Sequence, residues 1–334
     1  MGLNQKLRYI SLLFCLFLTV SAGAQAIPSG KDGERLLSQA VNEHLLRSQV
    51  GFLTDPLCEG RATGSRGAVE AGAWIARQFS LYGLLPLAQE HFSSFIAEGK
   101  IGRNILGFSP SSYPSGKYIV IAAHYDNIGV LNGNIYPGAD SNASGVAALL
   151  ALARLNRGSM ALGQLSTCNI IFAALDAKQL SYAGAESLYA SIAEGRLRDP
   201  RTGVVITPDR VSLMVNLDTI GSSLEPVHKA RKDFIIMLGG NEAENNALNL
   251  ANYSSGAMLD LCYDYYGSKD FTDLFLNRLG DQKIFLAHKV HSILFTSGIT
   301  MNTNKIEDTE DSLDYPVLRR RILLIYNWLN RILS

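Results

Sequence analysis

The chain has 334 residues, of which 47% are apolar and 18% charged, so it is long enough to bury a stable core without crosslinks. Thirty basic and thirty acidic residues give a formal net charge of zero, which removes the electrostatic signature expected of a nucleic-acid-binding protein. The one dense basic cluster, Arg319-Arg320-Arg321, falls in a C-terminal helical pattern and is interpreted as one solvated helix face.

The first 26 residues have the three parts of a secretory signal peptide. Basic residues precede an apolar run, 10–20, and small residues follow it. This run is shorter than the ~20 residues of a membrane-spanning helix, and no later run approaches that length. We therefore expect cleavage after Ala24 or Ala26, export to the periplasm or the extracellular space, and a mature chain that is not embedded in a membrane.

Three cysteines, Cys58, Cys168 and Cys262, remain after that cleavage. An odd number leaves at least one unpaired thiol in an oxidising compartment. Cys168 opens a predicted buried strand and is interpreted as a small core residue. Whether Cys58 pairs with Cys262 stays open.

Apolar periodicity predicts the secondary structure along the chain. Helices are predicted at 31–49 and 66–82, with a loop at 58–65. Later helical patterns cover 143–155 and 270–279. Continuous apolar runs predict strands at 118–123, 169–175, 211–217, 234–238 and 292–295. Unbroken apolar strands are buried on both faces, so we predict one α/β domain, 27–334, with three α/β/α layers and a mixed, mostly parallel central sheet covered by helices.

Polar residues follow the predicted strands at the points where they end. His124 and Asp126 come directly after the first strand, Asp176 after the second and Asp218 after the third. Asp140 lies in a glycine-bounded loop before a helical pattern, from which it can reach the same edge. Sites in open α/β sheets assemble at the carboxyl ends of the strands, so we expect these side chains to lie close together.

One imidazole and two carboxylates, from His124, Asp140 and Asp218, suit a zinc ion with an open position for water. Asp126 is expected to accept the other ring N–H of His124 and fix its tautomer. A structural alternative is that Asp140 caps a helix and Asp126 turns a loop. That alternative predicts that His124→Ala is tolerated like a surface change.

In this order and spacing, the motifs resemble the co-catalytic zinc aminopeptidases, a family of zinc exopeptidases that includes glutaminyl cyclases and glutamate carboxypeptidases. Segments 59–65 and 103–105 also resemble the family, so the resemblance covers most of the mature chain. It implies a zinc-exopeptidase-like fold. It also implies that His124 and Asp218 bind a first zinc ion and that Asp140 bridges two ions.

Several positions depart from the family pattern. Lys178 and Gln179 stand where the family has a Glu-Glu pair, which supplies the general base and a ligand of the second zinc. Asn304 stands at the position of a late histidine ligand, and Ser141 replaces the second aspartate of the Gly-Ala-Asp-Asp run. The resemblance therefore implies one zinc ion or none, with an empty second site.

Lys178 cannot act as a carboxylate base unless its pKa falls by several units, and anionic neighbours shift that pKa the other way. We expect its role to be electrostatic, with the ammonium near Asp140 and Asp218 partly substituting for the lost cation.

These departures favour a degenerate site without normal peptidase turnover. Together with the predicted signal peptide, they indicate an exported protein of this kind. Its pocket would still bind the N-terminus of a peptide or small protein, because binding and catalysis are separable. The alternative is an active metallo-exopeptidase, an aminopeptidase that uses a single metal and an acid from elsewhere in the chain. By composition, the candidates for that extra group are His228, His288, His291, Glu307 and Glu310.

An aromatic cluster precedes the late helical pattern and comprises Tyr263, Tyr265, Tyr266 and Phe271. The family resemblance implies that this region lines the substrate pocket, with an apolar preference. Ordinary core and loop packing is the favoured interpretation.

Overall fold

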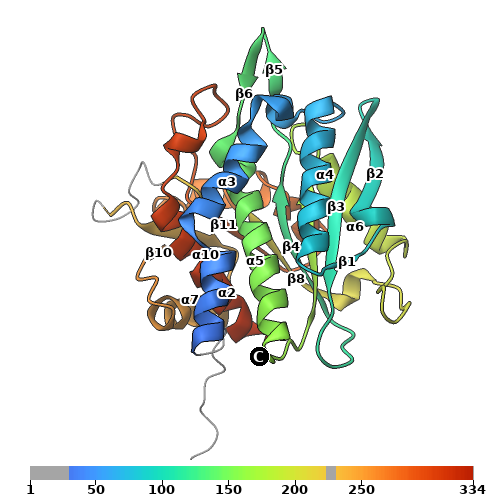
Figure 1. The fold of residues 1–334 in the computed structure, drawn as a ribbon, viewed down its shortest axis with the longest axis vertical. Helices are drawn as coiled ribbons and strands as arrows, with labels where there is room; N and C mark the ends of the chain where they lie inside the picture. The colour runs from blue at the N-terminus through green and yellow to red at the C-terminus, as the bar shows by residue number, and fades with distance from the viewer. Residues whose placement is uncertain (1–29, 223–230, 334) are drawn as a thin grey trace, which may run out of the picture.

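A computed structural model describes residues 30–222 and 231–333. The predicted signal peptide and His228 lie outside the described residues. A nine-stranded sheet runs through the molecule, with helices on both of its faces (Figure 1). Its strand order is β1-β3-β7-β4-β8-β11-β9-β10, and β2 pairs with β3. The predicted α/β fold with a mixed, mostly parallel sheet flanked by helices is confirmed.

The strands of this sheet are β1 (Leu85–Pro86), β2 (Phe92–Ala97), β3 (Lys100–Ser109), β4 (Tyr118–His124), β7 (Asn169–Leu175), β8 (Val211–Leu217), β9 (Phe234–Leu238), β10 (Asp260–Cys262) and β11 (Ser292–Thr296). The helices are α2 (Lys31–Ala40), α3 (Glu43–Thr54), α4 (Arg66–Leu81), α5 (Ser144–Ala161), α6 (Ala183–Ala193), α7 (Glu242–Ser254), α8 (Lys269–Asn277), α9 (Gln282–Ala287) and α10 (Tyr315–Ile332). A separate hairpin of β5 (Gly129–Leu131) and β6 (Asn134–Tyr136) projects at the top of Figure 1.

The middle of the sheet is parallel and is formed by β7, β4, β8 and β11. Every residue of β4 and of β7 is buried. The register places His124 opposite Leu175 and Leu217 opposite Phe295, so these strands end at one edge. All five predicted strands are present, each within one residue of its expected bounds.

Successive residues of β4 contribute to two different cores. Ile119 and Ile121 belong to the larger apolar cluster, which contains α5 and α10. Val120 and Ala122 belong to a second cluster, which contains α6 and α9. Side chains alternate across a strand, and both faces are covered here, which explains why the apolar run is unbroken.

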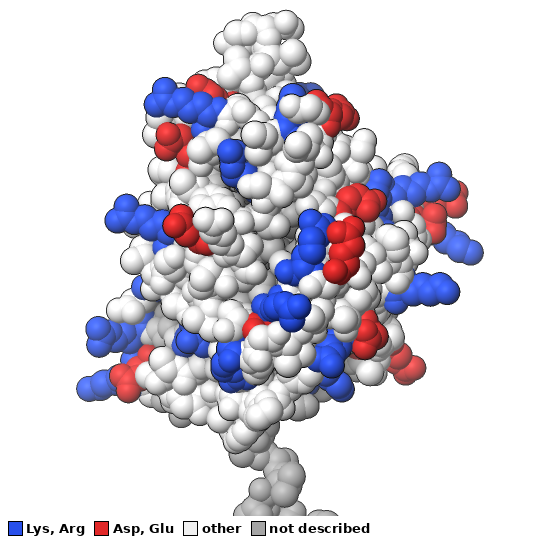
Figure 2. Space-filling model, turned by 90° about the vertical axis from the view of Figure 1, so that its right-hand side faces the viewer, with Lys and Arg blue, Asp and Glu red and all other residues white. Residues whose placement is uncertain are grey.

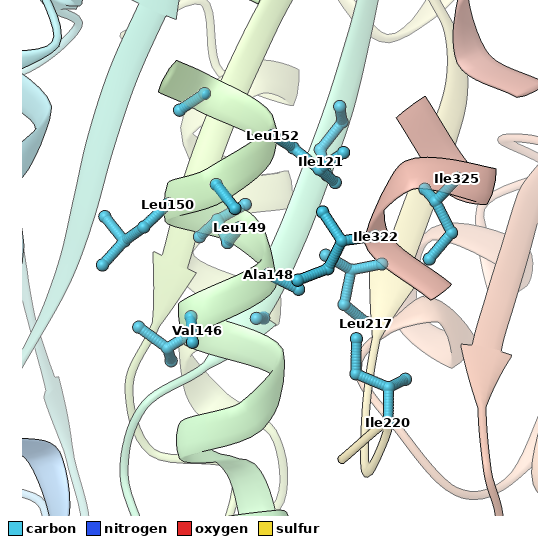
Figure 3. Close-up of a cluster of buried hydrophobic side chains, with 14 of the residues drawn as sticks. Ile121, Val146, Ala148, Leu149, Leu150, Leu152, Leu217, Ile220, Ile322 and Ile325 are labelled. Carbon is cyan, nitrogen blue, oxygen red and sulfur yellow. The ribbon is translucent and has the colours of Figure 1, made fainter. Parts of the chain in front are cut away.

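Helix α5 is sandwiched between the sheet and the outer helices. In Figure 3 its side chains meet those of the sheet and of α10, with Leu152, Ile121 and Ile322 among them. Ten consecutive residues, 144–153, are buried, so this helix has no polar face over that length. Each fully buried aliphatic side chain contributes roughly 1.5–3 kcal/mol to stability, which makes α5 the centre of the larger core.

The predicted helix at 31–49 is two helices, α2 and α3. The break occurs at Asn42, whose side-chain oxygen accepts the main-chain N–H of Leu45 at 2.7 Å. An asparagine with extended backbone geometry that accepts this bond starts a new helix. The single long helix was therefore a wrong prediction, and Asn42 was the signal for the break.

All three described cysteines are buried and free, so Cys58 and Cys262 do not pair. Burial raises the pKa of the Cys58 and Cys168 thiols to about 11 and that of Cys262 to about 12. The interpretation of Cys168 as a core residue is confirmed.

Figure 2 shows basic and acidic side chains interspersed over one face of the molecule, which agrees with the balanced charge of the chain. Within residues 30–222 and 231–333, no helix is long and apolar enough to cross a membrane.

A buried arginine holds the predicted loop between the early helices. Arg61 is completely buried, and its guanidinium donates to the main-chain oxygens of Tyr125 at 2.7 Å, Pro137 at 2.7 Å and Gly138 at 2.9 Å, and to that of Leu53. These bonds tie the segment after β4 to the loop that contains Asp140.

Arg61→Met is expected to lower the free energy of unfolding by at least ~3 kcal/mol, because each buried carbonyl left without a donor costs ~1–3 kcal/mol. Urea denaturation measures the loss. Arg66→Met, at an exposed position, is the matched control and is expected to change stability by less than ~0.5 kcal/mol. Equal losses in the two variants would contradict a structural role for the Arg61 guanidinium.

Candidate functional site

A cavity of about 220 Å³ opens at the carboxyl ends of β8 and β11. Its wall includes five positions from the predicted motifs, namely Ser141, Lys178, Gln179, Asp218 and Asn304. The sequence motifs and the cavity therefore coincide.

His124 ends β4, and its imidazole is completely buried. Its Nδ1 lies 3.0 Å from the main-chain oxygen of Asp126 and 3.5 Å from the Asp126 carboxylate. A ring N–H at Nδ1 donates to that carbonyl and leaves Nε2 as an acceptor. The Nδ1 atom of His124 thus faces Asp126, with the main-chain oxygen as the nearer partner and the carboxylate farther away.

The carboxylate of Asp126 also positions the loop after β7. It accepts the main-chain N–H of Lys178 at 3.0 Å and that of Gln179 at 3.1 Å. This contact turns the Lys178 side chain toward the end of β4.

The ammonium of Lys178 joins the two side chains that were predicted to bind the first zinc. Its Nζ lies 3.0 Å from His124 Nε2 and 2.6 Å from Asp218 Oδ2. The side chains of Lys178 and Asp218 are only 18% and 11% exposed, so the pair is screened less than a surface ion pair. The structure therefore places a cation from the protein itself between these two groups.

Both members of this pair are held in their charged forms. Burial favours the neutral amine of Lys178, but the carboxylates of Asp218 and Asp281 raise its pKa above the ordinary value. Burial likewise opposes ionisation of Asp218, but the charge of the Lys178 ammonium lowers its pKa below the ordinary range.

Asp281 is a further acidic residue near this pair that sequence reasoning missed. It is completely buried, and within the described chain neither carboxylate oxygen has a hydrogen-bond partner. Burial raises its pKa to about 6, while His124 and Lys178 act in the opposite direction. In the sequence, an aspartate after Gly280 at the start of a short helix has the pattern of an ordinary helix cap. No sequence signal therefore distinguished Asp281 from a capping residue.

Asp140 is not among the residues that line the cavity. Its Oδ1 accepts the main-chain N–H of Gly221 at 2.7 Å and the hydroxyl of Ser144 at 3.0 Å. The Asp308 carboxylate holds the loop by accepting the main-chain N–H groups of Asp140 at 2.8 Å and Ser141 at 3.1 Å. The structure thus brings His124 and Asp218 together and leaves Asp140 outside the cavity wall, where Ser141 stands instead.

The extra acids proposed from composition are also absent from the cavity wall, as far as the structure describes it. Neither Glu307 nor Glu310 lines it. His288 stacks on Tyr189 with ring centroids 3.9 Å apart, and His291 Nε2 lies 2.8 Å from a Glu244 carboxylate oxygen.

The predicted aromatic cluster at 263–271 overlaps the start of α8 and packs beside the cavity. Tyr265 is buried, and its ring stacks on Phe275 with centroids 3.8 Å apart. Phe275 lines the cavity, but none of the four predicted aromatic residues does. The packing interpretation is confirmed for Tyr265. The apolar wall comes from Phe275 of α8, from Leu279 after that helix and from Leu294 of β11.

The donor set can be compared with the needs of zinc, which ordinarily has three or four protein ligands. Within residues 30–222 and 231–333, no three His, Cys, Asp or Glu side chains are grouped to hold a metal ion. His124 and Asp218 are two such ligands, and both already contact an ammonium. As arranged here, the site fits an internal ion pair and does not fit a zinc ion.

A family model described as peptidase family M28 matches residues 104–329 of the chain. A comparison with curated protein sequences found no match.

Several solved structures share the fold. LapB from Legionella pneumophila is 17% identical with a TM-score of 0.66, and the match covers 93% of this chain and 78% of that one. BSAP, a zinc aminopeptidase from Bacillus subtilis, is 13% identical with a TM-score of 0.65, over 88% and 96% of the two chains. A glutaminyl cyclase from Macrostomum lignano is 16% identical with a TM-score of 0.66, over 94% and 96%.

Lys178→Met is expected to lower the free energy of unfolding by about 3–5 kcal/mol near neutral pH, because it leaves the buried Asp218 carboxylate without its counter-ion. The double variant Lys178→Met/Asp218→Asn is expected to lose less than the sum of the two single losses. Urea denaturation in the presence of a chelator measures all three variants. Lys117→Met, at an exposed position, is the control, and strictly additive losses would contradict the ion pair.

The loss of stability in Lys178→Met is expected to depend on pH and to be smaller at low pH. In the wild type, the lowered pKa of Asp218 stabilises the folded state at any pH above the pKa of Asp218 in the unfolded chain. This stabilisation is lost as the pH falls toward the lower pKa of the folded state. In Lys178→Met, burial without the ammonium raises the pKa of Asp218. Protonation of Asp218 as the pH falls then removes an uncompensated buried charge and stabilises the variant. The stability difference between the two proteins is therefore expected to narrow from about pH 7 to about pH 4 in denaturation curves. A stability difference that does not change with pH would show that an interaction other than the Lys178–Asp218 ion pair causes the loss of stability.

Proposed function

Because the chain belongs to peptidase family M28, we propose that it is a metal-free binding protein on the aminopeptidase fold, which holds the N-terminus of a peptide or small protein without hydrolysing it. The resemblance predicted from the motifs is confirmed, and members of this family bind zinc. The observation that carries the proposal is the position of the Lys178 ammonium, 3.0 Å from His124 and 2.6 Å from Asp218.

The first support concerns the metal. Zinc lies ~2.0–2.2 Å from its imidazole and carboxylate ligands, and an ammonium between those ligands both fills the space and repels the ion. The positions expected to serve a second ion carry the neutral amides of Gln179 and Asn304. Zinc would supply an activated water, and these residues offer little to hold it.

The second support concerns the base. A general base needs a free lone pair within reach of the attacking water. Lys178 is protonated because Asp218 and Asp281 raise its pKa against the effect of burial, and Asp218 is paired with it. Asp281 does not line the cavity. Asp218, which carries the only carboxylate among the described lining residues, is therefore paired through Oδ2 and buried at Oδ1, so it offers no accessible base.

The third support is that a pocket remains. Its volume of about 220 Å³ is below the ~300–1,000 Å³ of a drug-sized site, so it suits the end of a chain better than a folded surface. Phe275, Leu279 and Leu294 provide apolar walls. Since catalysis and binding are separable, such a pocket can retain a ligand after the catalytic groups are lost.

Export is part of the proposal and rests on the composition of residues 1–26 alone. A periplasmic or extracellular location would bring the pocket into contact with peptides released outside the cytoplasm.

Elemental analysis of the purified mature chain is expected to find less than about 0.1 zinc ion per chain, because the internal ammonium excludes the metal. The variant Ser141→Asp/Lys178→Glu/Gln179→Glu/Asn304→His is expected to gain zinc, since it restores anionic and imidazole ligands at positions on the cavity wall. The control Gln39→Glu/Lys117→Glu places two of these charge changes at exposed positions and is expected to gain none.

One zinc ion per wild-type chain would overturn the metal-free proposal. Hydrolysis of an amino-acid anilide by that wild type, abolished in His124→Ala, would support the single-metal exopeptidase instead.

A further inference from the structure

We infer that the cavity selects peptide N-termini that carry a neutral acyl group, followed by an apolar side chain, and rejects those with a free ammonium. This inference rests on the proposed binding function and specifies its ligand.

The cavity wall offers no free negative charge to a ligand. Among the described lining residues, only Lys178 and Asp218 are charged, and they are paired at 2.6 Å. The other carboxylate oxygen of Asp218, Oδ1, has no hydrogen-bond partner in the described chain, but it is buried and so is not exposed to a ligand. A ligand ammonium would therefore lose its hydration beside a like charge and gain no anionic partner, which is an unfavourable exchange.

Neutral polar groups on the wall are available instead. The side chains of Ser141, Gln179 and Asn304 line the cavity, and none of them makes a hydrogen bond to another described residue. A primary amide offers both donors and an acceptor, and a hydroxyl offers both roles as well. This set complements the carbonyl and N–H of an acyl amide.

The rest of the wall is apolar. Phe275, Leu279 and Leu294 line the interior, and Ile299 stands at the wall with 53% of its surface exposed. Met301, two residues later, is 77% exposed. An apolar side chain next to the acyl group would cover this surface, which is the usual driving force for a concave site.

The test compares two peptides that differ only at the N-terminus, Leu-Gly-Gly amide and N-acetyl-Leu-Gly-Gly amide. Calorimetric titration of the mature chain in the presence of a chelator is expected to give a Kd at least about tenfold lower for the acetylated peptide. An α-amino group has a pKa near 7.7–8.0, so raising the pH from about 7 to about 9 is expected to narrow the difference by neutralising the free amine. The affinity for the acetylated peptide is expected to stay unchanged.

Gln179→Glu supplies the missing negative charge at the cavity wall without changing the shape of the side chain. It is expected to tighten binding of Leu-Gly-Gly amide at pH 7 by at least about threefold and to weaken binding of the acetylated peptide. Gln39→Glu changes the net charge equally at an exposed position and is expected to leave both affinities unchanged.

Tighter binding of the free-amine peptide to the wild type would overturn this inference and leave the binding function intact. Binding of neither peptide would overturn both. Equal effects of Gln179→Glu and Gln39→Glu would show that the peptides bind elsewhere.

Discussion

The contact between the Lys178 ammonium and the pair of His124 and Asp218 is the constraint on which the site depends. The side chain of Asp218 is only 11% exposed, so a neighbouring cation stabilises its charge. In a metalloenzyme that cation arrives from solution, and its occupancy follows the free metal concentration. Here it is tethered to the backbone of the loop after β7, so it is always present. The described structure thus balances the charge of Asp218 with a group of the chain itself.

The scaffold around this contact is fixed by buried polar groups that reach several loops at once. Arg61 joins the segment after β4 to the loop at Pro137 and Gly138, and Asp308 holds the main chain at Asp140 and Ser141. Asp126 holds the main chain at Lys178 and Gln179. Each of these groups sets the position of a loop without touching the cavity. The site is thus positioned by main-chain contacts of residues that lie outside the cavity wall.

The sequence predicted five of the nine strands of the sheet, because a strand buried on both faces has an unbroken apolar run, as in β4 and β7. It did not predict β1, β2, β3 or β10. It also predicted that His124, Lys178 and Asp218 share one edge, since parallel strands end together. It predicted that Asp140 faces the site, whereas its neighbour Ser141 lines the cavity. Which of them faces the cavity depends on main-chain bonds to Asp308, a residue more than 160 positions away. Asp281 was missed for a similar reason, because its burial arises only when α9 packs on the sheet.

The three described cysteines are free, which bears on the conditions under which the chain can fold. Cys58, Cys168 and Cys262 are buried and unpaired, and burial raises the pKa of each thiol. A thiol that stays protonated and out of solvent reacts slowly with oxidants and with other disulfides. The described fold closes around apolar packing and contains no disulfide bond. Folding therefore requires no oxidant and no disulfide exchange, and the same native state is available in reducing and in oxidising solution.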